Sequence, residues 1–254
     1  GQNSLCYIGH SQGTAQCFAA LSSNQDLQSK IDLFIALAPV TTLQYQTSKI
    51  FRLLTTIKTE ALIAMLGIGE IGKNQIYRSV LPQFASKLVG SIGLNDLWGL
   101  CMDCDIDPAC LPILTQFEPS PTSTQTLAHW SQLVRSGKFH AYDHGPTMNE
   151  TIYGQPSPPE YDLKNIHIPV AVFYGELDYL ANPLDVEKFL LLQLPNVVTA
   201  MKIPNFKHND FVWGRRACEE VYPHIIDLLN QVRERKRDQY DLENQCDTPT
   251  TSTR

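Results

Sequence analysis

Short apolar runs and helix-compatible segments alternate near both ends of the chain. The runs of strand length are residues 4–8, 31–38, 170–174 and 197–203. The helix-compatible segments are residues 14–22, 183–192 and 219–233. The second run is apolar enough for both faces of a sheet to be covered, as in parallel sheets. Strands that alternate with helices predict an α/β fold around a parallel sheet.

The middle of the chain does not follow this alternation. Residues 42–166 contain helical patterns, for example at 59–66 and at 124–135, and Gly137 ends the second of these. We interpret this block as a helical cap inserted into the core. The predicted organisation is a core part at 1–41, the cap and lid at 42–166, a second core part at 167–232, and a disordered charged tail at 233–254.

A motif with chemical content follows the first apolar run. Gly9-His10-Ser11-Gln12-Gly13 is a Gly-x-Ser-x-Gly pattern between a strand and a helix-compatible segment. This arrangement builds a nucleophile elbow, a sharp turn that presents a serine hydroxyl at the top of a sheet. Gly9 and Gly13 are expected where a Cβ would clash with neighbouring backbone. Ser11 is therefore the candidate nucleophile of an α/β-hydrolase fold, and the alternative is a chance pattern in a glycine-containing loop.

A serine nucleophile needs a base that takes its proton and a carboxylate that orients the base. In the hydrolase fold these groups follow in the order Ser, Asp, His. Asp178 comes just after the run at 170–174, where a parallel sheet delivers side chains to its functional edge. The rival carboxylates are Glu176, Asp185 and Asp210, and the alternative role for Asp178 is a turn or a helix cap.

His208 is the candidate base, because it lies on a loop after the last predicted strand. The other histidines are His10, His129, His140, His144, His167 and His224. Of these, His10 stands beside the serine and is expected to line the pocket. The alternative for His208 is a solvated loop side chain, yet it alone satisfies both the required order and the required position.

Together these segments resemble the acid lipases, the family that includes gastric and lysosomal acid lipases. The segments that carry the resemblance are residues 9–14, 36–40, 129–130, 136–143, 175–178 and 208–214. The resemblance extends over nearly the whole chain, up to about Leu229. The resemblance implies a triad of Ser11, Asp178 and His208, with the main-chain N–H of Gln12 as one oxyanion donor. It also implies a helical cap with a lid, and hydrolysis of triacylglycerols or cholesteryl esters at an oil–water surface in a secreted or lysosomal protein.

The elbow lies unusually early in this chain. In α/β-hydrolases it follows the fifth strand, whereas here ten residues precede Ser11 and the chain begins with Gly1. We therefore expect the C-terminal part of a longer protein, with any signal peptide in the part before it. In the acid lipases the second oxyanion donor comes from a loop after the third strand, which this chain does not contain.

Residues 81–110 of the predicted cap combine large apolar side chains with Gly90, Gly93 and Gly99. One interpretation is a buried cap helix with flexible ends. The other is a mobile lid that covers the site and opens at a lipid surface, with glycines at its hinges. Both interpretations fit the pattern.

Charge and composition exclude some functional classes. The 254 residues carry a net charge of −6 and no basic patch, which argues against a nucleic-acid partner. No apolar run reaches the ~20 residues of a membrane span. We expect no cofactor and no metal ion, because Cys101 and Cys104 form a Cys-x-x-Cys pair without the second pair that a zinc site needs.

Two features are consistent with an oxidising compartment. Of seven cysteines, Cys101, Cys104 and Cys110 cluster, and a disulfide among them is favoured over free thiols in that setting. The acid-lipase resemblance covers these cysteines only in part, so no pairing is carried over. Asn149-Glu150-Thr151 is the single glycosylation sequon.

The leading hypothesis is a serine hydrolase that cleaves carboxylic esters of lipids through an acyl-enzyme. One alternative is an esterase that uses the same residues on small esters. Another is a non-catalytic lipid-binding relative, or a chain that is inactive by itself.

Overall fold

The computed structural model describes residues 3–47, 70–71, 110, 113 and 122–246. Its main sheet has four strands, β1 (Leu5–His10), β2 (Ile31–Leu37), β5 (Val170–Gly175) and β6 (Val197–Ile203). They lie in the order β1-β2-β5-β6, and every neighbouring pair is parallel. The predicted α/β fold and its four core strands are thus confirmed. In the described sheet, β1 is an edge strand.

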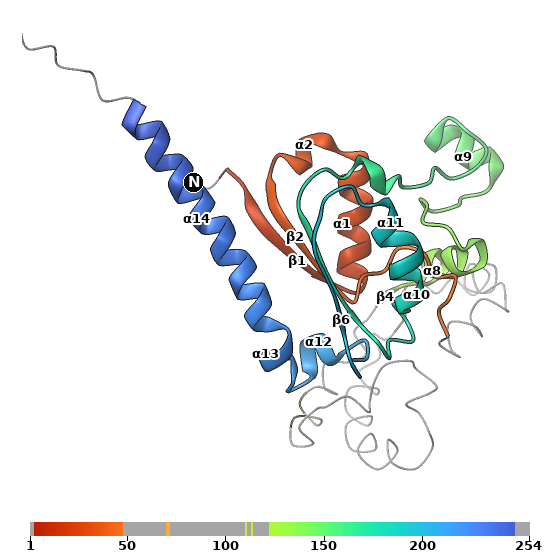
Figure 1. Cartoon of the computed structure of the whole chain (residues 1–254). Helices are drawn as coiled ribbons and strands as arrows, with labels where there is room; N and C mark the ends of the chain where they lie inside the picture. Colours follow the sequence, from red (N-terminus) through yellow and green to blue (C-terminus); the bar gives the residue numbers. More distant parts are fainter. Residues whose placement is uncertain (1–2, 48–69, 72–109, 111–112, 114–121, 247–254) are drawn as a thin grey trace, which may run out of the picture.

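Helices cover both faces of this sheet (Figure 1). On one side lie α1 (Gln12–Ser23) and a continuous helical segment made of α10 (Pro183–Asp185), η2 (Val186–Leu190) and α11 (Leu191–Gln193). On the other side lies the long α14 (Tyr222–Cys246). The short elements α2 (Gln25–Gln28), η1 (Leu163–Asn165), α12 (Asp210–Trp213) and α13 (Ala217–Glu220) connect these layers.

The core lies around the two central strands. Every residue of β5 is buried, and in β2 only Asp32 is partly exposed. Because both faces of these strands are buried, their apolar residues follow one another along the strand and do not merely alternate with polar ones. β2 ends at Leu37, because the next residue, Ala38, has a positive φ of 46° and Pro39 follows it. The Ala38 N–H still bonds to the Phe173 oxygen of β5.

The predicted cap is described in part. The helix expected at 124–135 is α8 (Thr124–Ser136), where Ser123 accepts from the Thr126 N–H at the start and Gly137 has a φ of 65° at the end. A second helix, α9 (Pro146–Tyr153), follows it. β3 (Glu70–Ile71) and β4 (Thr122–Ser123) form a separate antiparallel pair. The helix expected at 59–66 and, apart from Cys110, the lid expected at 81–110 lie outside the described residues.

The C-terminal segment differs from the prediction. We expected the last helix to end near Arg233 and a disordered tail to follow, whereas α14 continues to Cys246. Residues 233–246 contain neither Gly nor Pro and are rich in good helix formers. In addition, the Lys236 ammonium lies 2.5 Å from an Asp32 carboxylate oxygen at the start of β2 and 2.6 Å from the Ser4 hydroxyl. Residues 247–254 lie outside the described part.

Among the described residues, no helix combines the length and the apolarity that crossing a membrane requires.

Candidate active site

Ser11 occupies a strained turn between β1 and α1. Its φ of 52° and ψ of −120° lie in a region that side chains other than glycine rarely adopt. The Ser11 N–H bonds to the Leu37 oxygen of β2, which fixes the turn against the neighbouring strand. The Ser11 hydroxyl does not cap α1, and so it is available to another partner.

The two glycines of the elbow have different roles. A Cβ on Gly9 would lie 2.9 Å from the Tyr7 ring and 3.0 Å from the carbonyl carbon of Gly13, so only glycine fits there. A Cβ on Gly13 would meet only the Tyr7 hydroxyl, at 3.7 Å, an ordinary contact. The expected clash is therefore confirmed at Gly9 and wrong at Gly13.

The structure brings Ser11, His208 and Asp178 together, although they come from different elements. Ser11 follows β1, Asp178 follows β5 and His208 follows β6, and the carboxyl ends of parallel strands meet at one edge of a sheet. The His208 Nε2 lies 2.6 Å from the Ser11 Oγ, and the His208 Nδ1 lies 2.8 Å from an Asp178 carboxylate oxygen. Because a carboxylate only accepts, Nδ1 carries the hydrogen and Nε2 is left to accept the serine proton.

Main-chain groups hold the Asp178 carboxylate in place. Its other oxygen accepts hydrogen bonds from the N–H groups of Leu180 and Ala181, at 2.9 and 2.8 Å. Only 1% of Asp178 and 3% of His208 are exposed. The pair is therefore shielded from water. The low dielectric of these surroundings strengthens the hydrogen bond between Asp178 and His208.

The rival carboxylates have other partners. Glu176 accepts from the Asn205 N–H at 3.1 Å, and Asp210 accepts from the Lys207 N–H at 2.6 Å. Asp185 is buried and accepts from the Thr42 hydroxyl and from the N–H groups of Gln44 and Tyr45. Burial raises the pKa of Asp185, while these three bonds act in the opposite direction. Its contacts bind the segment after β2 to α10.

Two other histidines, both in the predicted cap, make structural contacts. The His129 Nε2 lies 2.8 Å from the His140 oxygen, and the His140 Nε2 lies 2.9 Å from the Ser136 hydroxyl. Burial lowers the pKa of His129. His10 does not simply line a pocket as expected, because its Nε2 lies 2.8 Å from the main-chain oxygen of His208.

Gln12 stands at the start of α1, directly after the serine. Thr14 and Ala15 donate the first hydrogen bonds of the helix, both to the Ser11 oxygen. The N–H groups of Gln12 and Gly13 precede these bonds and so belong to the amides that a helix leaves without internal partners. They lie at the positive end of the helix dipole, where an oxyanion next to Ser11 would be stabilised.

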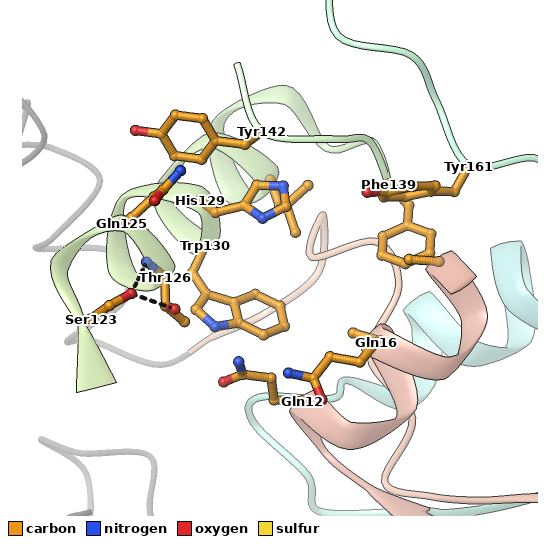
Figure 2. A pocket seen from close by; sticks show the side chains of 13 residues that line it. Gln12, Gln16, Ser123, Gln125, Thr126, His129, Trp130, Phe139, Tyr142 and Tyr161 are labelled. Atoms are coloured by element: carbon orange, nitrogen blue, oxygen red, sulfur yellow. Dashed lines mark hydrogen bonds between the residues drawn. The ribbon is translucent and has the colours of Figure 1, made fainter. Parts of the chain in front are cut away.

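A pocket of about 330 Å³ begins at Gln12 and lies between α1 and α8, a helix of the predicted cap. Figure 2 shows Gln12 and Gln16 on one wall and Trp130 and His129 on the other. The remaining lining residues are Ala15, Ala19, Ser123, Gln125, Thr126, Leu133, Phe139, Tyr142 and Tyr161. No lining residue is an acid, a lysine or an arginine, so the pocket suits an uncharged, largely apolar ligand.

The described residues include one of the three clustered cysteines and the predicted glycosylation sequon. Cys110 is a free, exposed thiol, whereas Cys101 and Cys104 lie outside the described part. The sequon residue Asn149 is fully buried. Its amide donates to Asp143 and to the Pro156 oxygen, and its oxygen accepts from the His144 N–H. In the folded state this side chain is not accessible for glycosylation.

The described residues include no group of three or more His, Cys, Asp or Glu side chains placed to hold a metal ion. The chemistry available at this edge of the sheet is that of a serine hydroxyl, an imidazole, a carboxylate and main-chain amides.

The parallel sheet, with its elbow and its candidate site residues at the strand ends, has the α/β-hydrolase fold. The solved structure of a soluble variant of monoglyceride lipase from Saccharomyces cerevisiae, in complex with a substrate analogue, has the same fold. It aligns with a TM-score of 0.56 and 17% identity, covering 90% of this chain and 62% of that chain.

Among proteins compared by sequence, the curated relatives of this chain are lipases. The chain is 37% identical to gastric triacylglycerol lipase of Bos taurus over 241 residues, and 39% identical to that of Mus musculus over 241 residues. It is 32% identical to lipase member K of Homo sapiens over 246 residues. These matches cover 90–91% of this chain and confirm the resemblance to the acid lipase family. No family model matches the sequence.

The chain spans 58–59% of the length of these curated relatives.

Proposed function

We propose that this protein is a carboxylic-ester hydrolase that acts on lipid esters. The observation that carries the proposal is the hydrogen-bonded series from the Ser11 Oγ through the His208 ring to Asp178, at 2.6 and 2.8 Å. A serine, an imidazole and a carboxylate in this order are the parts of a nucleophilic acyl transfer.

In the first half of the proposed reaction, the Ser11 Oγ attacks the acyl carbonyl carbon while His208 Nε2 takes the hydroxyl proton. The Asp178 carboxylate accepts from Nδ1 and stabilises the imidazolium that forms. The carbonyl oxygen becomes an oxyanion, which accepts from the Gln12 N–H. When the carbon–oxygen bond to the alcohol breaks, His208 returns the proton to the leaving oxygen.

The second half removes the acyl group from Ser11. A water molecule gives a proton to His208 Nε2 and attacks the ester carbonyl of the acyl-enzyme. The tetrahedral intermediate then collapses, the bond to the Ser11 Oγ breaks, and His208 returns its proton to that oxygen. The products are a free fatty acid and the regenerated serine.

The relatives and the pocket support a lipid substrate. The curated relatives include gastric triacylglycerol lipases and a protein of Crotalus adamanteus named as a lysosomal acid lipase/cholesteryl ester hydrolase. Triacylglycerols or sterol esters at an oil–water surface are therefore the proposed substrates. The uncharged, aromatic-rich pocket that begins at Gln12 suits an acyl chain. With such relatives we propose a secreted or lysosomal location, a helical cap over residues 42–166, and a lid at 81–110.

Covalent labelling tests the proposal most directly. A fluorophosphonate probe reacts with an activated serine and should label the wild-type protein but not the Ser11→Ala variant. Hydrolysis of emulsified triolein, measured by release of free fatty acid, should disappear in the same variant.

Two outcomes would contradict the proposal. Absence of labelling in a folded wild-type protein would favour a non-catalytic lipid-binding relative. Labelling together with hydrolysis of soluble butyrate esters but not of emulsified triolein would show a small-ester esterase.

A further inference from the structure

His10 links the elbow strand to the candidate base. It is the last residue of β1 and directly precedes Ser11. Its Nε2 lies 2.8 Å from the main-chain oxygen of His208, and the two rings lie 5.1 Å apart between centroids, tilted by 45°. One side chain therefore joins the residue before the nucleophile to the residue that would take its proton.

The chemistry of this contact fixes the proton on His10. A main-chain oxygen can only accept, so His10 Nε2 donates and the ring is the Nε2–H tautomer. Burial and the neighbouring His208 lower the pKa of His10 to about 4, although the contact to the His208 oxygen and the charge of Asp178 act in the opposite direction. His10 is therefore a neutral donor above that pH.

The contact acts on a different part of His208 from the contacts with Ser11 and Asp178. Ser11 and Asp178 hold the two ring nitrogens. His10 instead holds the main chain from which the ring extends, in the loop between β6 and α12. Nearby, the Leu177 N–H bonds to the Phe206 oxygen at 2.9 Å and fixes the same loop against the Asp178 loop.

We infer that His10 is a positioning residue, which sets the distance between His208 Nε2 and the Ser11 hydroxyl by donating a hydrogen bond to the His208 main-chain oxygen. This inference rests on the proposed hydrolase function. Since His10 and Ser11 are consecutive, any movement of the elbow is transmitted to the base. A displacement of about 1 Å between reacting groups can cost on the order of a hundredfold in rate.

Three variants of the intact protein separate positioning from other roles. His10→Phe keeps an aromatic ring but has no donor. His10→Asn keeps an amide donor that is too short to reach, and His10→Gln places an amide nitrogen near the position of Nε2. For Phe and Asn we expect kcat and the fluorophosphonate labelling rate to fall roughly 10- to 100-fold, with KM changed less than about twofold. His10→Gln should restore most of the rate.

A spectroscopic measurement tests the contact without turnover. The His208 Nδ1 proton shared with Asp178 should give a strongly downfield proton resonance in the wild type and in His10→Gln. In His10→Asn this resonance should broaden or move upfield under conditions where the variant is fully folded, which a purely structural role would not produce.

Other results would overturn the inference. A His10→Asn protein with wild-type kcat and an unchanged resonance would show that the contact positions nothing. A rise in KM at constant kcat would make His10 a substrate contact. Equal losses in the Gln and Asn variants would exclude the hydrogen bond as the cause. Absence of labelling in the wild type would instead count against the proposed function, while the resonance would still report on His10.

Discussion

The hydroxyl of Thr14 accepts a hydrogen bond from the main-chain N–H of Val40 at 2.9 Å. The same hydroxyl donates to the Ser11 oxygen at 2.6 Å, and Thr14 is fully buried. One side chain thus joins the first turn of α1 to the elbow and to the segment that leaves β2. The elbow geometry depends on these hydrogen bonds of Thr14 as well as on Gly9.

Thr14→Val should therefore destabilise the protein, because it keeps the shape but leaves the buried Val40 N–H without an acceptor. We expect a loss of about 1–3 kcal/mol in the free energy of unfolding, measured by urea denaturation. Thr14→Ser, which keeps the hydroxyl, is the control and should lose less. Equal losses in the two variants would assign the effect to the methyl group.

Substitutions in the proposed triad should act as a unit. In the intact protein we expect Ser11→Ala and His208→Ala to lower kcat by roughly 10⁴-fold or more, and Asp178→Ala somewhat less. The folded state of Ser11→Ala should persist, because the Ser11 side chain makes no helix cap. Substantial turnover in His208→Ala with normal serine labelling would show that another group is the base.

The sequence predicted those parts of the fold that depend on local pattern. The strand at 197–203 has the predicted bounds, and α8 ends at Ser136, directly before the glycine that was predicted to stop it. Order and position after the strands selected Ser11, Asp178 and His208, and the structure places these three side chains within hydrogen-bond distance, while their catalytic roles stay a prediction. Local pattern and chain order carry this information because parallel strands bring their ends to one edge.

Features that depend on distant contacts were missed. The tail was assigned from its charge, but α14 continues because Lys236 meets Asp32 and Ser4, more than two hundred residues earlier in the chain. The sequon at Asn149 gave no sign that its side chain is enclosed by Asp143 and Pro156. Similarly, no spacing rule connects His10 with the backbone of His208.

The stability of the protein should depend on pH through His10. Its folded-state pKa of about 4 lies below the ordinary value of 6.5, so between these pH values the unfolded chain binds more protons than the folded one. Stability is therefore expected to rise with pH from about 4 to 6.5, by on the order of 2–3 kcal/mol from this group. Asp185, whose pKa is raised, contributes with the opposite sign.

His10→Gln isolates the histidine contribution, since it leaves Asp185 and His129 unchanged. Urea unfolding at pH 4.5 and pH 7 should show a smaller pH difference in this variant than in the wild type. An identical difference in both proteins would mean that His10 is not the titrating group.

The pocket between α1 and α8 should select for acyl-chain length. Trp130 forms part of its wall, so Trp130→Ala removes a large apolar surface from it. We expect kcat/KM for a long-chain ester to fall roughly tenfold and that for an acetate ester to change less than threefold, in line with a few lost apolar contacts. Arg135→Ala, on the same helix but outside the pocket lining, is the control. Equal losses on both esters would assign Trp130 to cap stability alone.

The last prediction concerns the exposed edge of the sheet at β1. In the described sheet β1 pairs only with β2, and Leu5 and Ile8 are 56% and 46% exposed. An apolar edge strand with unpaired backbone groups promotes association between chains. We therefore expect the 254-residue chain, expressed by itself, to aggregate at micromolar concentration.

A charge at this edge provides the sharper test. Ile8→Lys should increase the soluble fraction of the 254-residue chain, because a lysine on an edge strand opposes strand pairing. If further strands pair with β1 in the intact protein, the same substitution should lower its stability, since the lysine would then be buried. A soluble, monomeric 254-residue chain would contradict the prediction, because β1 would then be an edge strand that does not promote association.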